Sequence, residues 1–154
     1  MQGKPLKSVI ENDSKIHDAV LYGIHGGQVN ITDGRYVYSR APKDKNNLPL
    51  YEYTLMPTHM RGFFDLEELK NIEISNDFNF TKDVKLNKIP ARKIAGWFEE
   101  EVFQTNLYDL KSKEKEDKPI NNPEIEKKMI DMLITLMKET DAPIEQYERL
   151  GLNN

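Results

Sequence analysis

The sequence predicts an α+β fold: a small antiparallel sheet of about four strands, with a long C-terminal helix packed on one face. Short segments with alternating apolar and polar residues dominate the first two thirds of the chain, and the last third holds one long segment with helical periodicity. Strands and helices that occupy separate parts of a sequence are typical of α+β proteins. The length of 154 residues fits one domain with a core of its own.

The first eighteen residues are mixed and polar, with a single apolar pair at Val9-Ile10. They show no sustained period, so we expect a connector in residues 1–18. The predicted folded part therefore covers residues 19–154.

The first strong local signal is Asp33-Gly34, a dipeptide suited to a two-residue type I′ turn because both central positions need φ > 0. We therefore predict a hairpin in which Ile31 pairs with Tyr36 and Val29 pairs with Tyr38. Residues on the same face recur at every second position. One face then carries Val29, Ile31, Tyr36 and Tyr38, and the other carries Asn30, Thr32, Arg35 and Val37.

Three short segments follow the hairpin. Residues Pro42 to Pro49 are rich in turn formers and predict a loop. Residues Leu50 to Met56 alternate as a strand that Pro57 ends. Asp65 can cap a short helix that reaches Lys70.

The middle of the chain is less regular. Residues Phe78 to Thr81 and Val84 to Leu86 alternate and predict two short strands or one bulged strand. Residues Ala91 to Gln104 are apolar enough to be packed, but their pattern leaves helix and strand both open. Residues Lys111 to Lys118 form a mixed-charge run, for which we expect a solvated loop.

The clearest helix signal begins at Asn122, which can cap it, with Pro123 at the first helical position and Lys138 near the end. One apolar stripe runs along it at spacings of three and four, made by Ile125, Met129, Met132, Leu133, Leu136 and Met137. Methionines at this spacing fit core packing better than a ligand groove. Residues 141–143 end the helix, and residues 145–150 are expected to add one further turn.

Composition excludes several classes of function. Zero cysteines rule out a disulfide framework, a thiolate metal site and a cysteine nucleophile. With 22 Lys and Arg against 26 Asp and Glu, the net charge of −4 provides no cationic field for nucleic acid. No apolar run approaches the roughly 18 residues of a membrane span, and the first residues lack the apolar core of a signal peptide. As the chain stands we expect a cytosolic protein, and the location of any longer parent stays open.

The first candidate for ligand contact is a glycine-rich loop around His25. Gly26 and Gly27 would let another backbone or a ligand approach the imidazole closely. The same glycines also fit a strand end with a bulge, which is the simpler interpretation.

The second candidate is the pair His59 and Arg61, just after Pro57. One imidazole and one guanidinium in a loop could contact an anion. Ordinary hydrogen bonding at the surface is the competing interpretation, and we favour it.

No catalytic pattern accompanies these residues. The three histidines form no HxH or HExxH pattern, and the glycine loop lacks both the P-loop and the GxGxxG spacing. No serine lies in a GxSxG context. We therefore predict no catalytic residues and no metal ligands in this chain.

Four segments resemble, in the same order, the C-terminal part of bacterial sulfatases of the alkaline phosphatase superfamily. They are GIHGGQVNITDGRYVYSRAP (23–42), LYEYTLMPTHMRG (50–62), NLYDL (106–110) and the final helix and tail from NPEIEKK to ERLGL (122–152). NLYDL is similar to the family's element that closes the sheet of this domain. GKPLKSVIEND (3–13) resembles the segment that joins the large catalytic domain to the C-terminal one. The resemblance implies that residues 1–18 are a connector from a catalytic domain and residues 19–154 a sulfatase-type C-terminal domain.

The catalytic features of that family are absent from this sequence. A sulfatase of the family carries Cys/Ser-x-Pro-x-Arg, whose first residue is oxidised to formylglycine so that its hydrate can attack the sulfate ester. It also binds a divalent cation, usually calcium, through an Asp-Asp pair and an Asp-Asn or Asp-His pair. Neither that motif nor an Asp-Asp, Asp-Asn or Asp-His pair occurs here. The resemblance therefore implies a structural or pocket-lining part of a sulfuric ester hydrolase, inactive alone, with calcium and formylglycine in a catalytic domain that is its partner. The candidate substrate contacts are His25, Gly26, Gly27, His59 and Arg61.

A free-standing binding or assembly module derived from such a domain is the competing interpretation. The loss of a catalytic domain should leave an apolar patch exposed, and large patches commonly mark partner surfaces. We therefore expect the isolated chain to self-associate. The ester that the parent hydrolyses, whether sulfate, phosphate or phosphonate, stays open.

Overall fold

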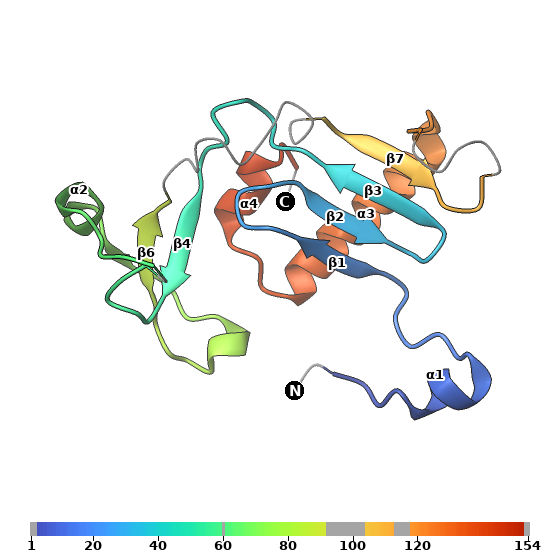
Figure 1. The fold of residues 1–154 in the computed structure, drawn as a ribbon, viewed down its shortest axis with the longest axis horizontal. Coiled ribbons are helices and arrows are strands. Elements are labelled where there is room, and N and C mark those ends of the chain that lie inside the picture. The colour runs from blue at the N-terminus through green and yellow to red at the C-terminus, as the bar shows by residue number, and fades with distance from the viewer. Residues whose placement is uncertain (1–2, 60, 92–103, 113–117, 153–154) are drawn as a thin grey trace.

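The computed structural model of the 154-residue chain describes residues 3–59, 61–91, 104–112 and 118–152 (Figure 1). Its elements, in chain order, are α1 (Lys7–Asn12), β1 (Val20–Gly23), β2 (Val29–Thr32), β3 (Tyr36–Arg40), β4 (Tyr51–Thr54), α2 (Leu66–Lys70), β5 (Glu73–Ile74), the 3₁₀ helix η1 (Asn79–Thr81), β6 (Asn87–Pro90), β7 (Asn106–Asp109), α3 (Pro123–Glu139) and α4 (Ile144–Arg149). Residues 91–104, whose pattern left helix and strand both open, lie almost wholly outside the described residues. Much of the mixed-charge run 111–118 lies outside them as well.

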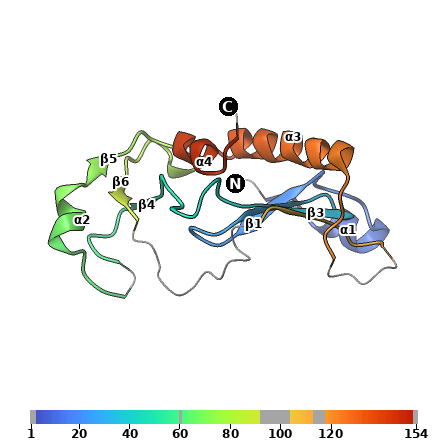
Figure 2. The same cartoon turned by 90° about the horizontal axis from the view of Figure 1, so that it is seen from above.

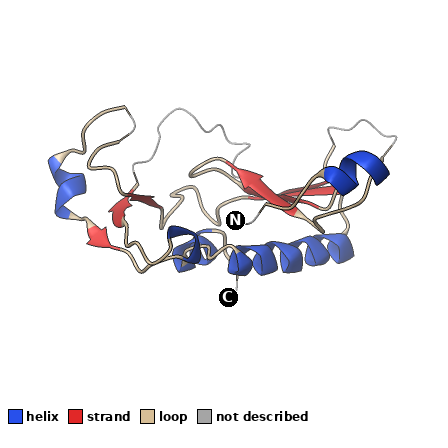
Figure 3. Cartoon of the chain, turned by 90° about the horizontal axis from the view of Figure 1, so that it is seen from below, coloured by secondary structure: helices blue, strands red, loops and turns tan. Residues whose placement is uncertain are grey.

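The strands form two antiparallel sheets, so the predicted α+β class is confirmed. Sheet A has the order β1-β2-β3-β7, and sheet B has the order β4-β6-β5. Helix α3 lies across one face of sheet A, as the views from above and below make clear (Figures 2 and 3). Sheet B and α2 form a second lobe beside sheet A, which the prediction of one sheet did not include (Figure 1).

The main core lies between α3 and sheet A. The α3 side chains Met129, Leu133 and Met137 are buried at intervals of four residues, as the apolar stripe predicted. They pack against Ile31 and Tyr38 of the hairpin, both fully buried. Leu107, Tyr147, Leu150 and Leu152 complete the same cluster. Met129 and Met137 are therefore core residues, and Met132 packs against this core while partly buried.

The ends of α3 match the capping signals. The Oδ1 atom of Asn122 accepts a hydrogen bond from the backbone N–H of Ile125 at 3.2 Å, and Pro123 occupies the first turn. The helix ends before Thr140, and Asp141 takes a left-handed conformation with φ 60°. The predicted further turn is α4.

The two faces of the β2–β3 hairpin carry the predicted residues, but the predicted register is wrong by two residues. Ile31 pairs with Tyr38, not with Tyr36. The reason lies in the turn: Asp33 Oδ1 accepts hydrogen bonds from the backbone N–H groups of Arg35 and Tyr36, and Asp33 N donates to the Tyr36 carbonyl. Gly34, with φ 91°, and Arg35 are therefore the central pair. A shift of two residues keeps every side chain on its face.

Sheet B has a small core of its own. Ile89 is 1% exposed, and Leu50, Phe64 and Leu86 are also buried. Helix α2 begins with the predicted cap: Asp65 Oδ1 accepts from Glu68 N, and Glu68 Oε2 accepts from Asp65 N.

The predicted strands at residues 78–81 and 84–86 are wrong. Residues Asn79–Thr81 form η1, and the chain then turns at Lys82 and Asp83, both with positive φ. The strand begins only at Asn87, because two consecutive left-handed residues cannot continue an extended ladder.

Residues 7–12 of the predicted connector form α1, and none of its residues is buried. Figure 1 shows α1 set apart from both sheets. Among the described residues, no helix has the length and apolar character to cross a membrane.

Candidate functional site

The glycine-rich loop joins β1 to β2. His25 is exposed there, whereas Gly26 and Gly27 are buried. Gly26 has φ 73°, a left-handed conformation that favours glycine, and Gly27 N donates to the Ile24 carbonyl at 3.0 Å. A Cβ atom on Gly27 would lie 2.9 Å from Ile24 Cγ1. The glycines therefore serve a tight turn of the chain itself.

Two side chains from distant parts of the sequence bind this loop. Asn47 Nδ2 donates to the Gly26 carbonyl at 2.7 Å, and Arg149 Nη1 donates to the Gly27 carbonyl at 3.1 Å. Arg149 Nη1 also donates to Asn47 Oδ1 at 2.9 Å. The close approach that the glycines permit is thus made by the chain's own side chains, whereas His25 is exposed.

Arg149 belongs to α4 and is only 2% exposed. Its Nε donates to Gln146 Oε1 at 2.9 Å, so its three acceptors are neutral oxygens. Burial lowers the pKa of Arg149 to about 10, which still leaves the guanidinium charged at neutral pH. Neither Arg149 nor Asn47 was predicted from the sequence. An arginine set between Tyr147 and Leu150, both core residues, was the available signal.

A second arginine fixes the chain end that carries Arg149. Arg40 Nε donates to the Leu150 carbonyl at 2.8 Å, and Arg40 Nη2 donates to the Gly151 carbonyl at 3.1 Å. Arg40 Nη1 donates to the hydroxyl of Tyr38, whose pKa is raised mainly by burial. Lys43 N donates to the Arg149 carbonyl at 2.8 Å. The end of α4 is therefore held against β3 and the loop that follows it.

His59 lies between two carboxylates of the sheet B lobe. Its Nδ1 is 3.3 Å from Glu52 Oε2 on β4, and its Nε2 is 3.0 Å from Glu68 Oε1 on α2. The ring also meets the Phe64 ring edge-on, with 4.4 Å between centroids. Because Glu68 is itself part of the α2 cap, His59 ties β4 to the start of that helix. Arg61 is exposed.

The structure gives the two candidate groups separate places. Residues 25–27 lie at one end of sheet A, and His59 and Arg61 lie between β4 and α2. No hydrogen bond or ion pair described for residues 3–59, 61–91, 104–112 and 118–152 joins one group to the other.

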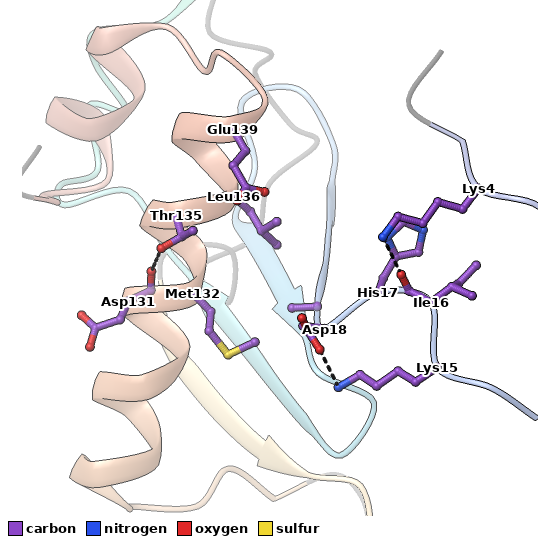
Figure 4. A pocket seen from close by; sticks show the side chains of 11 residues that line it. Lys4, Lys15, Ile16, His17, Asp18, Asp131, Met132, Thr135, Leu136 and Glu139 are labelled. Carbon is purple, nitrogen blue, oxygen red and sulfur yellow. Dashed lines mark hydrogen bonds and ion pairs between the residues drawn. The ribbon is translucent and has the colours of Figure 1, made fainter.

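A hollow of about 480 Å³ lies between α3 and residues 15–19, and Figure 4 shows side chains that line it. Lys4 Nζ donates to the Ile16 carbonyl at 2.9 Å, and Lys15 lies 3.7 Å from Asp18. On the α3 side, the hollow is lined by Asp131, Met132, Thr135, Leu136 and Glu139. The lining carries both signs of charge, Lys4 and Lys15 against Asp18, Asp131 and Glu139, so no single sign of charge selects a ligand.

Another hollow, of about 400 Å³, lies between the two lobes. Its lining includes Tyr51 and Lys88 from sheet B and Tyr147 from α4. Nearby, the Tyr53 hydroxyl donates to Glu145 Oε1. Burial is the main cause that raises the pKa of Tyr53, and the Glu145 carboxylate raises it further. These contacts join sheet B to α4.

The residues present do not fit the calcium or formylglycine of a sulfatase. Within the described part of the chain, no group of three or more His, Asp or Glu side chains could hold a metal ion. The full sequence contains no Cys/Ser-x-Pro-x-Arg.

Comparison with known proteins adds no identity: no protein-family model, no curated protein and no solved structure matches this chain.

Proposed function

We propose that this chain is the C-terminal α+β domain of a sulfatase-like sulfuric ester hydrolase. In this role it is a structural or substrate-pocket-lining part of the enzyme, and it has no hydrolytic activity alone. Its partner is a catalytic domain that carries the formylglycine and the calcium.

The observation that supports the proposal most is the spatial arrangement of the segments that carry the resemblance. Residues 23–42 contain β2 and β3, residues 106–110 contain β7, and residues 122–152 contain α3 and α4. Strand β7 pairs with β3 and forms one border of sheet A, the position expected of an element that closes the sheet. Three segments far apart in the sequence thus belong to one sheet and its covering helices.

Exposed apolar side chains on the sheet B lobe also support a domain that packs against a partner. Phe63, two residues before the α2 cap Asp65, is 86% exposed, and Leu66, the first residue of α2, is 75% exposed. Leu69 on the same helix and Leu55 and Met56 after β4 are exposed as well. Apolar groups gathered in this way commonly mark contact surfaces.

His25 is the residue of this domain best suited to reach a substrate. Its imidazole is exposed while the glycines beside it are held by Asn47 and Arg149. A side chain presented on a braced loop can contact an anionic or leaving group without a large ordering cost. Arg61 is the second exposed candidate, whereas His59 is occupied by two carboxylates.

The first experiment uses the isolated 154-residue chain, assayed for aryl sulfate hydrolysis with added calcium. We expect no turnover. Turnover that is abolished in the His25→Ala variant would overturn the assignment of an inactive domain.

The second experiment uses the parent enzyme, expressed from the extended coding sequence. His25→Ala should lower kcat/KM for the sulfate ester about tenfold, the equivalent of about 1.4 kcal/mol in transition-state binding. His17→Ala is the matched control, since His17 is also exposed but lies in the segment before β1, and it should leave kcat/KM unchanged. Equal effects of both variants would contradict a substrate contact at His25.

A free-standing binding or assembly module is the second candidate function. Val20 and Tyr22 on β1, a strand without charged residues, are exposed. These side chains favour the module, because they could serve association without a catalytic domain. A coding sequence with no upstream catalytic domain would favour this candidate over the first.

A further inference from the structure

Strand β1 is a border strand of sheet A. It pairs with β2 from Val20↔Thr32 to Gly23↔Val29, and no strand of the described part of the chain lies on its other side (Figure 1). The backbone N–H and C=O groups that point away from β2 are therefore free to pair with a further extended strand.

The side chains of this border strand alternate in a way that favours association. Val20 and Tyr22 are each 49% exposed and Ile24, the residue just after the strand, is 66% exposed. Leu21 lies between them on the opposite face, where it packs against the core under α3. Val20 and Tyr22 thus lie on the face of sheet A that α3 does not cover, and Ile24 lines one surface hollow with Tyr22.

The charged residues and prolines that normally prevent an edge strand from pairing with another chain are absent from this strand. From Ala19 to Ile24 the sequence has no charged residue and no proline. Natural edge strands usually carry a lysine, a proline or a bulge at such positions. An uncharged edge can face a second copy of itself without like-charge repulsion.

We propose that β1 pairs in antiparallel fashion with β1 of a second copy of this chain, about a two-fold axis at Tyr22. In this register Tyr22 faces Tyr22 of the second copy, and Val20 faces Ile24 of the second copy. All three exposed apolar side chains then enter direct cross-strand pairs on one face. The two sheets A become one continuous eight-stranded sheet.

The self-pairing fits the rest of the fold. Leu21 and α3 lie on the other face, so the core under α3 is unchanged by the new strand pair. A two-fold axis normal to the sheet keeps directly opposed side chains on the same face, as antiparallel pairing requires. The contact is small, which predicts a weak dimer that dissociates on dilution.

The absence of cysteine from the sequence makes a clean cross-linking test possible. Tyr22→Cys should form a disulfide-linked dimer under mild oxidation, because facing Cα atoms in an antiparallel pair lie within disulfide range. A mixture of Val20→Cys and Ile24→Cys should give a mixed dimer in preference to either self-linked dimer. Leu110→Cys, exposed beside the opposite border strand β7, is the control and should link slowly.

Sedimentation of the unmodified chain gives the second readout. We expect a concentration-dependent dimer that Tyr22→Lys abolishes, with the circular dichroism spectrum unchanged. A strictly monomeric chain at millimolar concentration would overturn the proposal. So would a dimer in which Leu110→Cys links as fast as Tyr22→Cys, since that would give the contact to another surface. The sulfatase proposal is tested separately, by the assay of the isolated chain for aryl sulfate hydrolysis and by His25→Ala in the parent enzyme.

Discussion

Replacing Arg149 with methionine should lower the free energy of unfolding by about 3 kcal/mol. The guanidinium donates to Gly27, Asn47 and Gln146, and each acceptor that loses its donor on substitution costs about 1–3 kcal/mol. Burial opposes this gain: it lowers the pKa of Arg149 from 12.5 to about 10. At about 1.4 kcal/mol per pKa unit, removal of the cation recovers roughly 3 kcal/mol. With about 2 kcal/mol for each lost bond, a net loss of about 3 kcal/mol remains.

Urea unfolding followed by circular dichroism measures this difference. Arg61→Met is the matched control, because Arg61 is exposed, and its unfolding free energy should stay within about 0.5 kcal/mol of the unmodified chain. The backbone amide NMR signals of Gly26 and Gly27 should shift in Arg149→Met and not in Arg61→Met. Equal or greater stability of Arg149→Met would mean that the cost of burying the cation exceeds the value of its bonds, and would refute the reasoning.

Three further predictions concern elements that hold sheet A and α3 together. Leu133→Ala removes a fully buried side chain from the core and should cost about 2–5 kcal/mol in thermal or urea unfolding. Asn122→Ala should cost about 1 kcal/mol through loss of the α3 cap, whereas Asn121→Ala, one residue earlier, should cost almost nothing. Burial by itself would raise the pKa of Asp33, but two backbone N–H groups of its turn and Lys128 lower it overall. Its stabilisation is therefore complete above the unfolded pKa and is lost as pH falls through the folded one. Asp33→Asn should thus be less stable by about 1 kcal/mol at neutral pH and equally stable in strong acid, as urea titrations at several pH values would reveal.

The hairpin illustrates what alternation can and cannot predict. Period-two patterning placed Ile31 and Tyr38 on the buried face because face depends only on parity. The register depends on which residues take the centre of the turn. Here the Asp33 side chain binds the backbone of the next turn residues and moves the turn by one position. Such a local side-chain bond competes with the standard turn and was not visible in the dipeptide alone.

Helix α3 was predictable because capping, propensity and the apolar stripe all agree. Strand β6 was not, since Asn87–Pro90 has one apolar interior residue and ends in proline. Its position is fixed by the pairs with β4 and β5 on its two sides. Pairing of this kind depends on tertiary context more than on local pattern.

The glycine loop was identified from sequence, but its partners were not. Gly27 and Arg149 are 122 residues apart, and no periodicity relates them. Their contact exists because α4 follows α3 back across sheet A and ends beside the β1–β2 loop (Figure 1). Likewise, the carboxylates that flank His59 come from β4 and α2, which meet only when sheet B forms.

The most direct test of the proposed function is the mass of the native protein. An antibody against the α3 segment, residues 123–139, would capture the protein from its source cells for intact-mass and peptide analysis. The sulfatase proposal predicts a polypeptide much larger than the 154-residue chain, with upstream peptides that contain Cys/Ser-x-Pro-x-Arg or its formylglycine product. A captured protein with the mass of the 154-residue chain alone would contradict it and favour the free-standing module.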